Sequence, residues 1–103
     1  MEFDRDQAIS AGDAMNEARA ARIRTLLEQA LAPQSLEVID ESHLHVGHAG
    51  ARDGRGHFRI RIVAAQFAGR SRLARHRMIY DALGDMMETD IHALAIEEDS
   101  GNE

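Results

Sequence analysis

The sequence predicts a single small domain of the α+β class, with its elements in the order α-β-β-α-β. Three observations lead to this prediction. The chain has 103 residues, which suffices for one compact domain with its own core. Two stretches carry apolar residues at helical spacing. Three shorter stretches alternate apolar and polar residues, as strands with one exposed face do.

The first predicted helix extends from Asp13 to Pro33. Asp13 is expected to be its N-cap, and Pro33 cannot continue a helix. The apolar residues with helical spacing between them are Met15, Ala18, Ile23, Leu26, Leu27, Ala30 and Leu31. Residues 1–12 are acidic and polar without a repeating period, so we expect a flexible N-terminal arm.

Two strands joined by a loop are predicted next. Residues 35–44 alternate, with Leu36 and Val38 on one face. Residues 57–65 have the clearest alternation in the chain, and the apolar side consists of Phe58, Ile60, Ile62 and Ala64. Residues 45–56 contain four glycines and are expected to form a long flexible loop. A loop between two adjacent strands predicts an antiparallel hairpin.

The second predicted helix begins after a turn at residues 67–69, with Ser71 as its N-cap. We expect Arg72, Arg75 and Asp81 to face outward. The apolar stripe of this helix is expected to contain Leu73, His76, Tyr80, Leu83 and Met87.

The last predicted strand begins at Asp90. Its alternation places three residues on one face: His92, Leu94 and Ile96. The domain is therefore expected to cover residues 13–97, and residues 98–103 are expected to form an acidic tail.

The composition argues against an enzyme and against a membrane protein. No cysteine is present, so the chain has no disulfide, no thiol nucleophile and no thiolate ligand of its own. No nucleophile-elbow motif surrounds Ser42 or Ser71, no phosphate-binding glycine loop occurs, and no lysine could form a Schiff base. No stretch is apolar enough to cross a bilayer, and no signal-peptide pattern is seen. We therefore expect a cytoplasmic protein, and no motif supports a hydrolase or a kinase.

Charge is distributed unevenly along the chain. The net charge is −6, which alone argues against nonspecific binding to nucleic acid. Residues 52–77, however, hold eight arginines and one acid. Four of these arginines are expected at and after the start of the second helix: Arg70, Arg72, Arg75 and Arg77. They could contact phosphate or an acidic partner, or they could form an ordinary solvated surface.

The chain contains six histidines, and three of them lie close together at His43, His45 and His48. This spacing resembles the H-x-H-x-D-H zinc motif of metallo-β-lactamase-like hydrolases. Gly47 stands where that motif has its acid, and the chain is too short for that fold. The residues alone favour a structural explanation, in which His43 lies on a strand face and His45 and His48 solvate a glycine-rich loop. His57, His76 and His92 are likewise compatible with purely structural roles.

Two longer motifs resemble the signature of the BolA family. The first reads Phe67-x-Gly69-x-Ser71-Arg72-Leu73-x-Arg75-His76-Arg77-x-Ile79-Tyr80-x-x-Leu83. The second reads Ile91-His92-Ala93-Leu94-x-Ile96. Upstream, Asp40-Glu41-Ser42-His43 and His57-Phe58 fit the same family in order and spacing, so the resemblance covers residues 18–97.

The resemblance implies a fold like that of class II KH domains, with a three-stranded sheet and helices on one face. It also implies a non-enzymatic protein that pairs with a monothiol glutaredoxin and shares a [2Fe–2S] cluster in iron homeostasis or cluster trafficking. One ligand is expected to be His92, and the other a loop histidine, His48 or its rival His45. Glutathione and the glutaredoxin cysteine would supply sulfur, and the chain alone would bind no cofactor.

The resemblance also leaves a second function open. Some relatives are described as DNA-binding transcription regulators linked to stress response and cell morphology. The arginines of the second helix would serve that role. Many relatives continue into a third helix after the last strand, where this chain has only its short acidic end. The oligomeric state, including a weak homodimer, is also left open.

Overall fold

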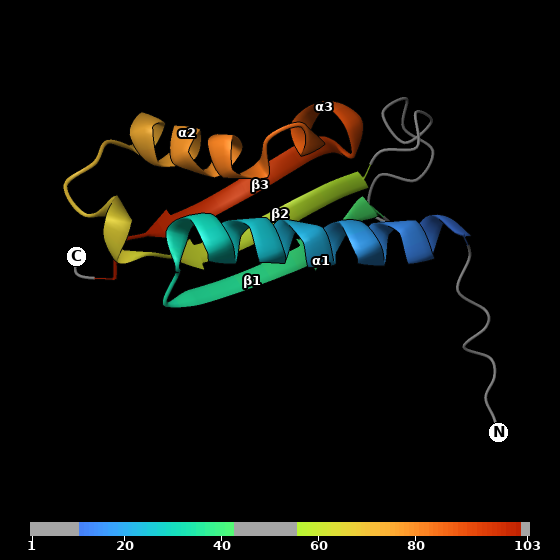
Figure 1. Ribbon diagram of the computed structural model, residues 1–103, viewed down its shortest axis with the longest axis horizontal. Coiled ribbons are helices and arrows are strands. Elements are labelled where there is room, and N and C mark those ends of the chain that lie inside the picture. Colours follow the sequence, from blue (N-terminus) through green and yellow to red (C-terminus); the bar gives the residue numbers. More distant parts are fainter. Residues whose placement is uncertain (1–10, 43–55, 102–103) are drawn as a thin grey trace, which may run out of the picture.

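The structure is a computed structural model, and it describes residues 11–42 and 56–101 (Figure 1). The predicted order α-β-β-α-β is confirmed, with two additional short helices after β2 and after α2. The elements are α1 (Ala11–Leu31), β1 (Ser35–Asp40), β2 (Gly56–Val63), the 3₁₀ helix η4 (Ala65–Phe67), α2 (Arg72–Leu83), α3 (Met86–Thr89) and β3 (Ile91–Asp99).

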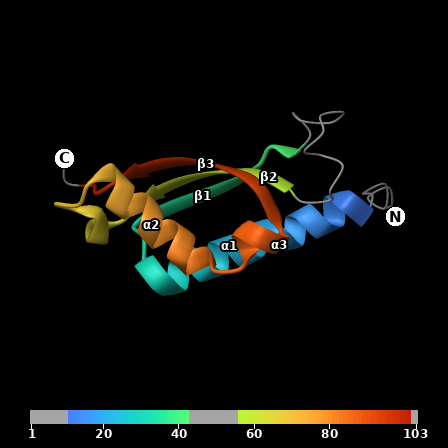
Figure 2. The same cartoon turned by 90° about the horizontal axis from the view of Figure 1, so that it is seen from above.

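The three strands form one mixed sheet in the order β1-β2-β3. β1 pairs antiparallel with β2, which confirms the predicted hairpin pairing, whereas β3 runs parallel to β2. A parallel pair needs a crossover connection, and η4, α2 and α3 provide it. Figure 2 shows that the helices lie on one side of the sheet, as expected, and leave its other face uncovered.

The core lies between the helices and the covered face of the sheet. β2 contributes alternate residues, as its sequence pattern predicts. The buried apolar residues are Ile23, Leu27, Leu31, Phe58, Ile60, Ile62, Ala64, Phe67, Ile79, Leu83, Met86 and Ile91. With only two phenylalanines among them, aliphatic side chains make up most of this interior.

The start of α1 differs from the prediction. The helix begins at Ala11, so Asp13 lies inside it and is not the N-cap. Its C-terminal half packs on the sheet, whereas Met15 in the first turns is 51% exposed. Figure 1 shows the reason, because the N-terminal end of α1 extends past the ends of the strands.

The buried face of α2 also differs from the prediction. Arg75, Ile79 and Leu83 are its buried residues, whereas Leu73 and Tyr80, which we expected in the buried stripe, are 62% and 40% exposed. The prediction failed because it placed the charged Arg75 outside and aligned the stripe with the apolar residues next to it. A charged side chain can occupy the buried face when a partner compensates its charge.

β3 is longer than expected. Glu98 and Asp99, assigned to the acidic tail, belong to the strand, and Asp99 pairs with Val63 of β2. Ser100 after the strand is fully buried. The last strand therefore extends two residues beyond residue 97, where we expected the domain to end. Cross-strand hydrogen bonding and the ion pair of Glu98, described below, hold these acidic residues in the fold.

The N-cap of α2 offers a test of this architecture. The Ser71 hydroxyl oxygen accepts a hydrogen bond from the Ala74 N–H at 3.1 Å, as the sequence predicts. Ser71→Ala leaves this donor without its cap, so we expect a loss of about 1 kcal/mol in the free energy of unfolding, measured by urea denaturation. Ser71→Thr should recover most of the loss. An unchanged midpoint for Ser71→Ala would contradict the capping role.

Candidate functional site

The structure brings His57 and His92 together at the end of the sheet where β2 and β3 both begin. His57 is the second residue of β2 and His92 the second residue of β3. Since the two strands are parallel, they start at the same edge. The imidazole ring centres are 5.0 Å apart, and the ring planes are inclined by 50°. His57 is 7% exposed, whereas His92 is exposed.

A register shift in the β2–β3 pairing places His92 at this point. Gly56 pairs with Ile91, but His57 pairs with Ala93, so His92 is an extra residue in β3. The sequence alternation predicted one face for His92, Leu94 and Ile96. Leu94 and Ile96 do pack against the core, but His92 is exposed. The shift interrupts the alternation at His92.

Backbone hydrogen bonds fix the strand ends that carry the two histidines. The Gly56 N–H donates to the Asp90 carbonyl at 3.0 Å, which joins the two starts directly. The His57 N–H donates to the Ser42 hydroxyl at 3.0 Å, and the His57 carbonyl accepts from the Glu41 N–H at 2.8 Å. A Cβ on Gly56 would lie 2.5 Å from the Phe58 ring, so this position requires glycine.

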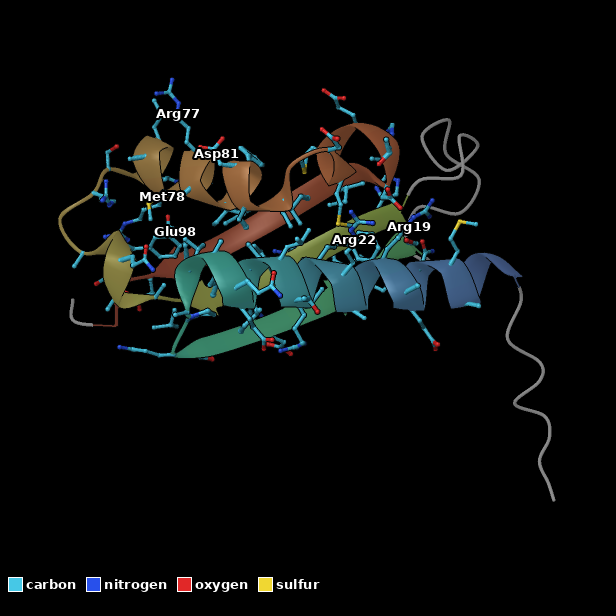
Figure 3. All side chains as sticks on the ribbon, in the orientation of Figure 1. Arg19, Arg22, Arg77, Met78, Asp81 and Glu98 are labelled. Carbon is cyan, nitrogen blue, oxygen red and sulfur yellow. The ribbon has the colours of Figure 1, made fainter. Side chains whose placement is uncertain are left out.

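Asp90 ties the start of β3 to α1. The Arg19 Nε donates to Asp90 Oδ2 at 3.1 Å, and Arg19 is labelled on α1 in Figure 3. The hydrogen bond from the Thr89 hydroxyl is the main cause that lowers the pKa of Asp90 from its ordinary value of 3.8. The bond and charge of Arg19 lower it further, and partial burial opposes them. The residue two positions before His92 is therefore held in its ionised form.

The other predicted ligands cannot be compared with the structure. His43, His45 and His48 lie outside the described residues. Within the described ranges, no group of three or more His, Cys, Asp or Glu side chains is placed to hold a metal ion. What this part of the chain offers is one pair of imidazoles.

His57 was missed as a candidate by reasoning from the sequence. The sequence places His57 at the start of a strand and is compatible with a purely structural role for it. The sequence does show that His57 lies at the start of one strand and His92 at the start of another, and this shared position is the signal that could have indicated their contact. This signal is informative only when the two strands are known to be parallel neighbours. The alternation of apolar and polar residues in each strand does not show which strand lies next to it.

The predicted arginine cluster is divided by the fold. Arg70, Arg72 and Arg77 are exposed, and Figure 3 shows Arg77 on the outer side of α2. Arg75, expected to face outward, is only 8% exposed. Its Nη1 lies 2.7 Å from Glu98 Oε1, and its Nε donates to the carbonyls of Phe67 and Arg70.

Because the ion pair of Arg75 and Glu98 is buried and its charges are compensated, Arg75 is not a surface cation. His76 Nε2 lies 3.8 Å from the second oxygen of Glu98, so His76 belongs to the same partly buried cluster. The outward position predicted for Arg75 is wrong for this reason.

The uncovered face of the sheet carries a network of ion pairs. Arg59 contacts Glu41 at 2.8 Å and Glu97 at 3.0 Å. Arg61 contacts Glu37 at 3.2 Å and Glu97 at 3.1 Å. The hydrogen bond to Glu41 is the main cause that raises the pKa of Arg59. Carboxylates on the neighbouring strands thus balance the two strand arginines.

A family model described as BolA-like protein matches residues 27–103. SufE-like protein 1 of Arabidopsis thaliana is 48% identical over 83 residues, which covers 76% of this chain and 22% of that protein. BolA-like protein 1 of Mus musculus is 43% identical over 88 residues, covering 85% of this chain and 62% of that protein. The DNA-binding transcriptional regulator BolA of Escherichia coli is 43% identical over 75 residues, covering 73% and 69%.

The solved structure of the BolA domain of SufE1 from Arabidopsis thaliana aligns with a TM-score of 0.73 and 44% identity, covering 84% of this chain and 96% of that domain. The structure is that of a small α+β protein with an exposed imidazole at the start of β3. Its sequence contains no cysteine. The chain belongs to the BolA family. It spans only part of the length of the Arabidopsis and mouse relatives.

Family membership confirms two predictions from the sequence. The chain has the BolA-like α+β fold, and it belongs to a family of non-enzymatic proteins. In the part of the chain that the structure describes, no helix is long and apolar enough to cross a membrane.

The interactions of the Asp90 carboxylate with Thr89 and Arg19 predict a pH-dependent contribution to the stability of the fold. Because the pKa of Asp90 is lowered in the folded state, its carboxylate stabilises the fold at pH values above its ordinary pKa of 3.8. This stabilisation is lost as the pH falls through the lowered value. Asp90→Asn should therefore lower the melting temperature at pH 7, and the difference from the wild type should shrink as the pH falls below 3.8.

The exposed Asp81, labelled on α2 in Figure 3, provides the control. Asp81→Asn should leave the melting temperature nearly unchanged at pH 7 and below pH 3.8, since most surface substitutions have little effect. An equal loss for Asp90→Asn at pH 7 and below pH 3.8 would contradict the ion-pair explanation.

Proposed function

We propose that this protein pairs with a monothiol glutaredoxin and contributes histidine ligands to a shared [2Fe–2S] cluster, in iron homeostasis or cluster trafficking. The observation that carries the proposal is the exposed imidazole of His92, held on a rigid sheet edge beside a second imidazole. Family membership supports the same role, because the motif containing His92 resembles the family's ligand motif.

The available donor atoms fit such a cluster. Without cysteine, the chain has no thiolate ligand, so thiolate sulfur must come from the partner. Imidazole replaces thiolate at one iron of Rieske [2Fe–2S] centres, so nitrogen ligation of this cluster type has precedent in iron chemistry. A glutaredoxin cysteine and glutathione would supply the sulfur ligands, and this chain would present its imidazoles.

The fold places the exposed arginines far from His92. Arg75 at the beginning of α2 contacts Glu98, which lies six residues after His92 in the same strand. At about 3.3 Å per residue, this separation is roughly 20 Å. Figure 1 shows the same arrangement, with the start of α2 beside the end of β3 and α3 beside its start. Cluster ligation and arginine contacts therefore use different ends of the molecule.

Cluster assembly tests the proposal. We expect the protein, mixed with a monothiol glutaredoxin, iron, sulfide and glutathione, to give visible absorption and circular dichroism spectra unlike those of glutaredoxin alone. His92→Ala should abolish most of the difference, because it removes a ligand.

The matched control is the double variant Arg72→Glu/Arg77→Glu, which alters the distant end of the molecule and should retain the mixed-cluster spectrum. Spectra identical to those of glutaredoxin alone for the wild-type protein would refute the proposal.

DNA binding is the second candidate function. It is favoured by the three exposed arginines Arg70, Arg72 and Arg77, and by similarity to a relative whose name describes a DNA-binding transcriptional regulator. The compensation of Arg59, Arg61 and Arg75 by carboxylates weakens it, because these three arginines of the predicted basic segment are not free positive charges. We therefore place this function second.

A salt titration separates this candidate from cluster ligation. If DNA binding uses these arginines, affinity should fall steeply with salt, and Arg72→Glu/Arg77→Glu should reduce it at least tenfold. His92→Ala should have no effect on it. Affinity that is insensitive to both salt and the arginine substitutions would rule out this mode of DNA binding.

A further inference from the structure

We propose that the outer face of α2 is a docking surface for an acidic segment of another protein, one that also carries large apolar side chains. Leu73, Arg77 and Tyr80 form the centre of this face, and Arg70 and Arg72 lie at its start. These five residues are called the α2 patch below. Four of them belong to the motif that resembles the family signature. Cluster ligation uses none of them, so the proposal does not rest on it.

Helical spacing places the central residues of the α2 patch side by side. Leu73 and Arg77 are four residues apart and Arg77 and Tyr80 three, so their side chains are neighbours on one face. At about 1.5 Å per residue, the distance along the helix from Leu73 to Tyr80 is about 10 Å. The buried residues of α2 lie on the opposite side, against the core. Figure 3 shows Arg77 and Asp81 on the outer side of the helix.

The apolar side chains of the α2 patch are left in water by the fold. Leu73 is 62% exposed and Tyr80 is 40% exposed. Among the described residues, Met15 on α1 is the only other large apolar side chain that is exposed. Single apolar residues are normal on a protein surface, but two that share one helix face between arginines are typical of an interaction site. A partner that covers them removes this apolar surface from water.

Contacts within the domain hold the α2 patch in place before any partner binds. The Ser71 cap fixes the start of the helix. The Tyr80 ring meets the His76 ring edge to face, with centres 6.4 Å apart and planes at 86°. The Arg70 Nε donates to the Gln66 carbonyl at 3.0 Å. Because these side chains are already restrained, docking costs less conformational entropy than it would on a flexible segment.

The charge of the α2 patch favours an acidic partner. Its three arginines are exposed, and in the part of the chain that the structure describes no carboxylate forms an ion pair with them. Asp81 is the only acid in α2. The patch is therefore a local positive surface on a chain with a net charge of −6. Arginine binds carboxylates through paired hydrogen bonds, and tyrosine and arginine are enriched among the residues that dominate binding energy.

A second copy of the chain and a nucleic acid fit the α2 patch less well. Two patches face to face would bring three arginines of each copy together, with only Asp81 of each to balance them. Phosphate groups are contacted by charged and polar groups, so a nucleic acid backbone would leave Leu73 without an apolar contact. An acidic protein segment with leucine or aromatic side chains matches both the charge and the apolar surface.

Selection from a display library of random peptides tests the proposal. We expect this protein to enrich peptides that combine several acidic residues with leucine or aromatic residues. Leu73→Gln/Tyr80→Gln should weaken binding of a selected peptide at least about tenfold by fluorescence anisotropy, because it removes the apolar anchors. Arg72→Glu/Arg77→Glu should weaken it as much. Met15→Gln is the matched control, since it removes an exposed apolar side chain on α1 and should retain full affinity.

Several results would overturn the proposal. They are a selection that enriches no acidic peptide, or selected peptides that bind Leu73→Gln/Tyr80→Gln as tightly as the wild type. A dimer in analytical ultracentrifugation that this variant loses would assign the α2 patch to a second copy, and a loss of duplex DNA affinity in it would assign the patch to nucleic acid.

Two further measurements keep the test independent of variant folding and of the proposed function. Addition of a selected peptide to the wild-type protein should shift the NMR signals of the α2 patch, and shifts confined to other elements would contradict the proposal. Leu73→Gln/Tyr80→Gln should still give the mixed-cluster spectrum with glutaredoxin, because both substitutions lie on the outer face of α2. Failure of the wild-type protein to form that cluster would refute the proposed function and leave the peptide result unaffected.

Discussion

In the parallel pair β2–β3, both strands start at the same edge of the sheet, so the chain must return the whole length of the sheet between them. α2 makes this return and packs Ile79 and Leu83 against the sheet on the way. α1 packs beside α2 on the same face. The covered face, the uncovered face and the location of the histidines all follow from this one pairing.

The two faces of the sheet handle charge in different ways. On the uncovered face, Arg59 and Arg61 interact with glutamates of both neighbouring strands in a solvated network, where each pair adds little stability. Under α2, Arg75 and Glu98 are each about 10% exposed, so their desolvation is costly and depends on close mutual contact. Loss of either partner would leave an uncompensated buried charge. This ion pair attaches the start of α2 to the end of β3.

The arrangement separates two chemical surfaces on a very small protein. The imidazoles lie where β2 and β3 begin, and the exposed arginines lie where β3 ends. Under the proposed function, a partner that supplies cluster ligands would have no need to cover the arginines. A polyanion bound to the arginines would likewise leave the imidazoles free. The two proposed functions, cluster ligation and DNA binding, therefore use different ends of one domain.

The sequence by itself determined the order of the elements, the apolar face of β2, the Ser71 cap and the lack of any thiolate ligand. These properties depend on local spacing, on single side chains or on composition, which can all be read along the chain. Only the tertiary structure decided that Arg75 is buried, that β3 extends to Asp99 and that His57 lies beside His92. Each of these depends on a partner from a distant part of the chain: Glu98 for Arg75, Val63 for Asp99, and the parallel strand for His57. Periodicity shows which face of a strand is apolar, but not which strand lies next to it or in which register.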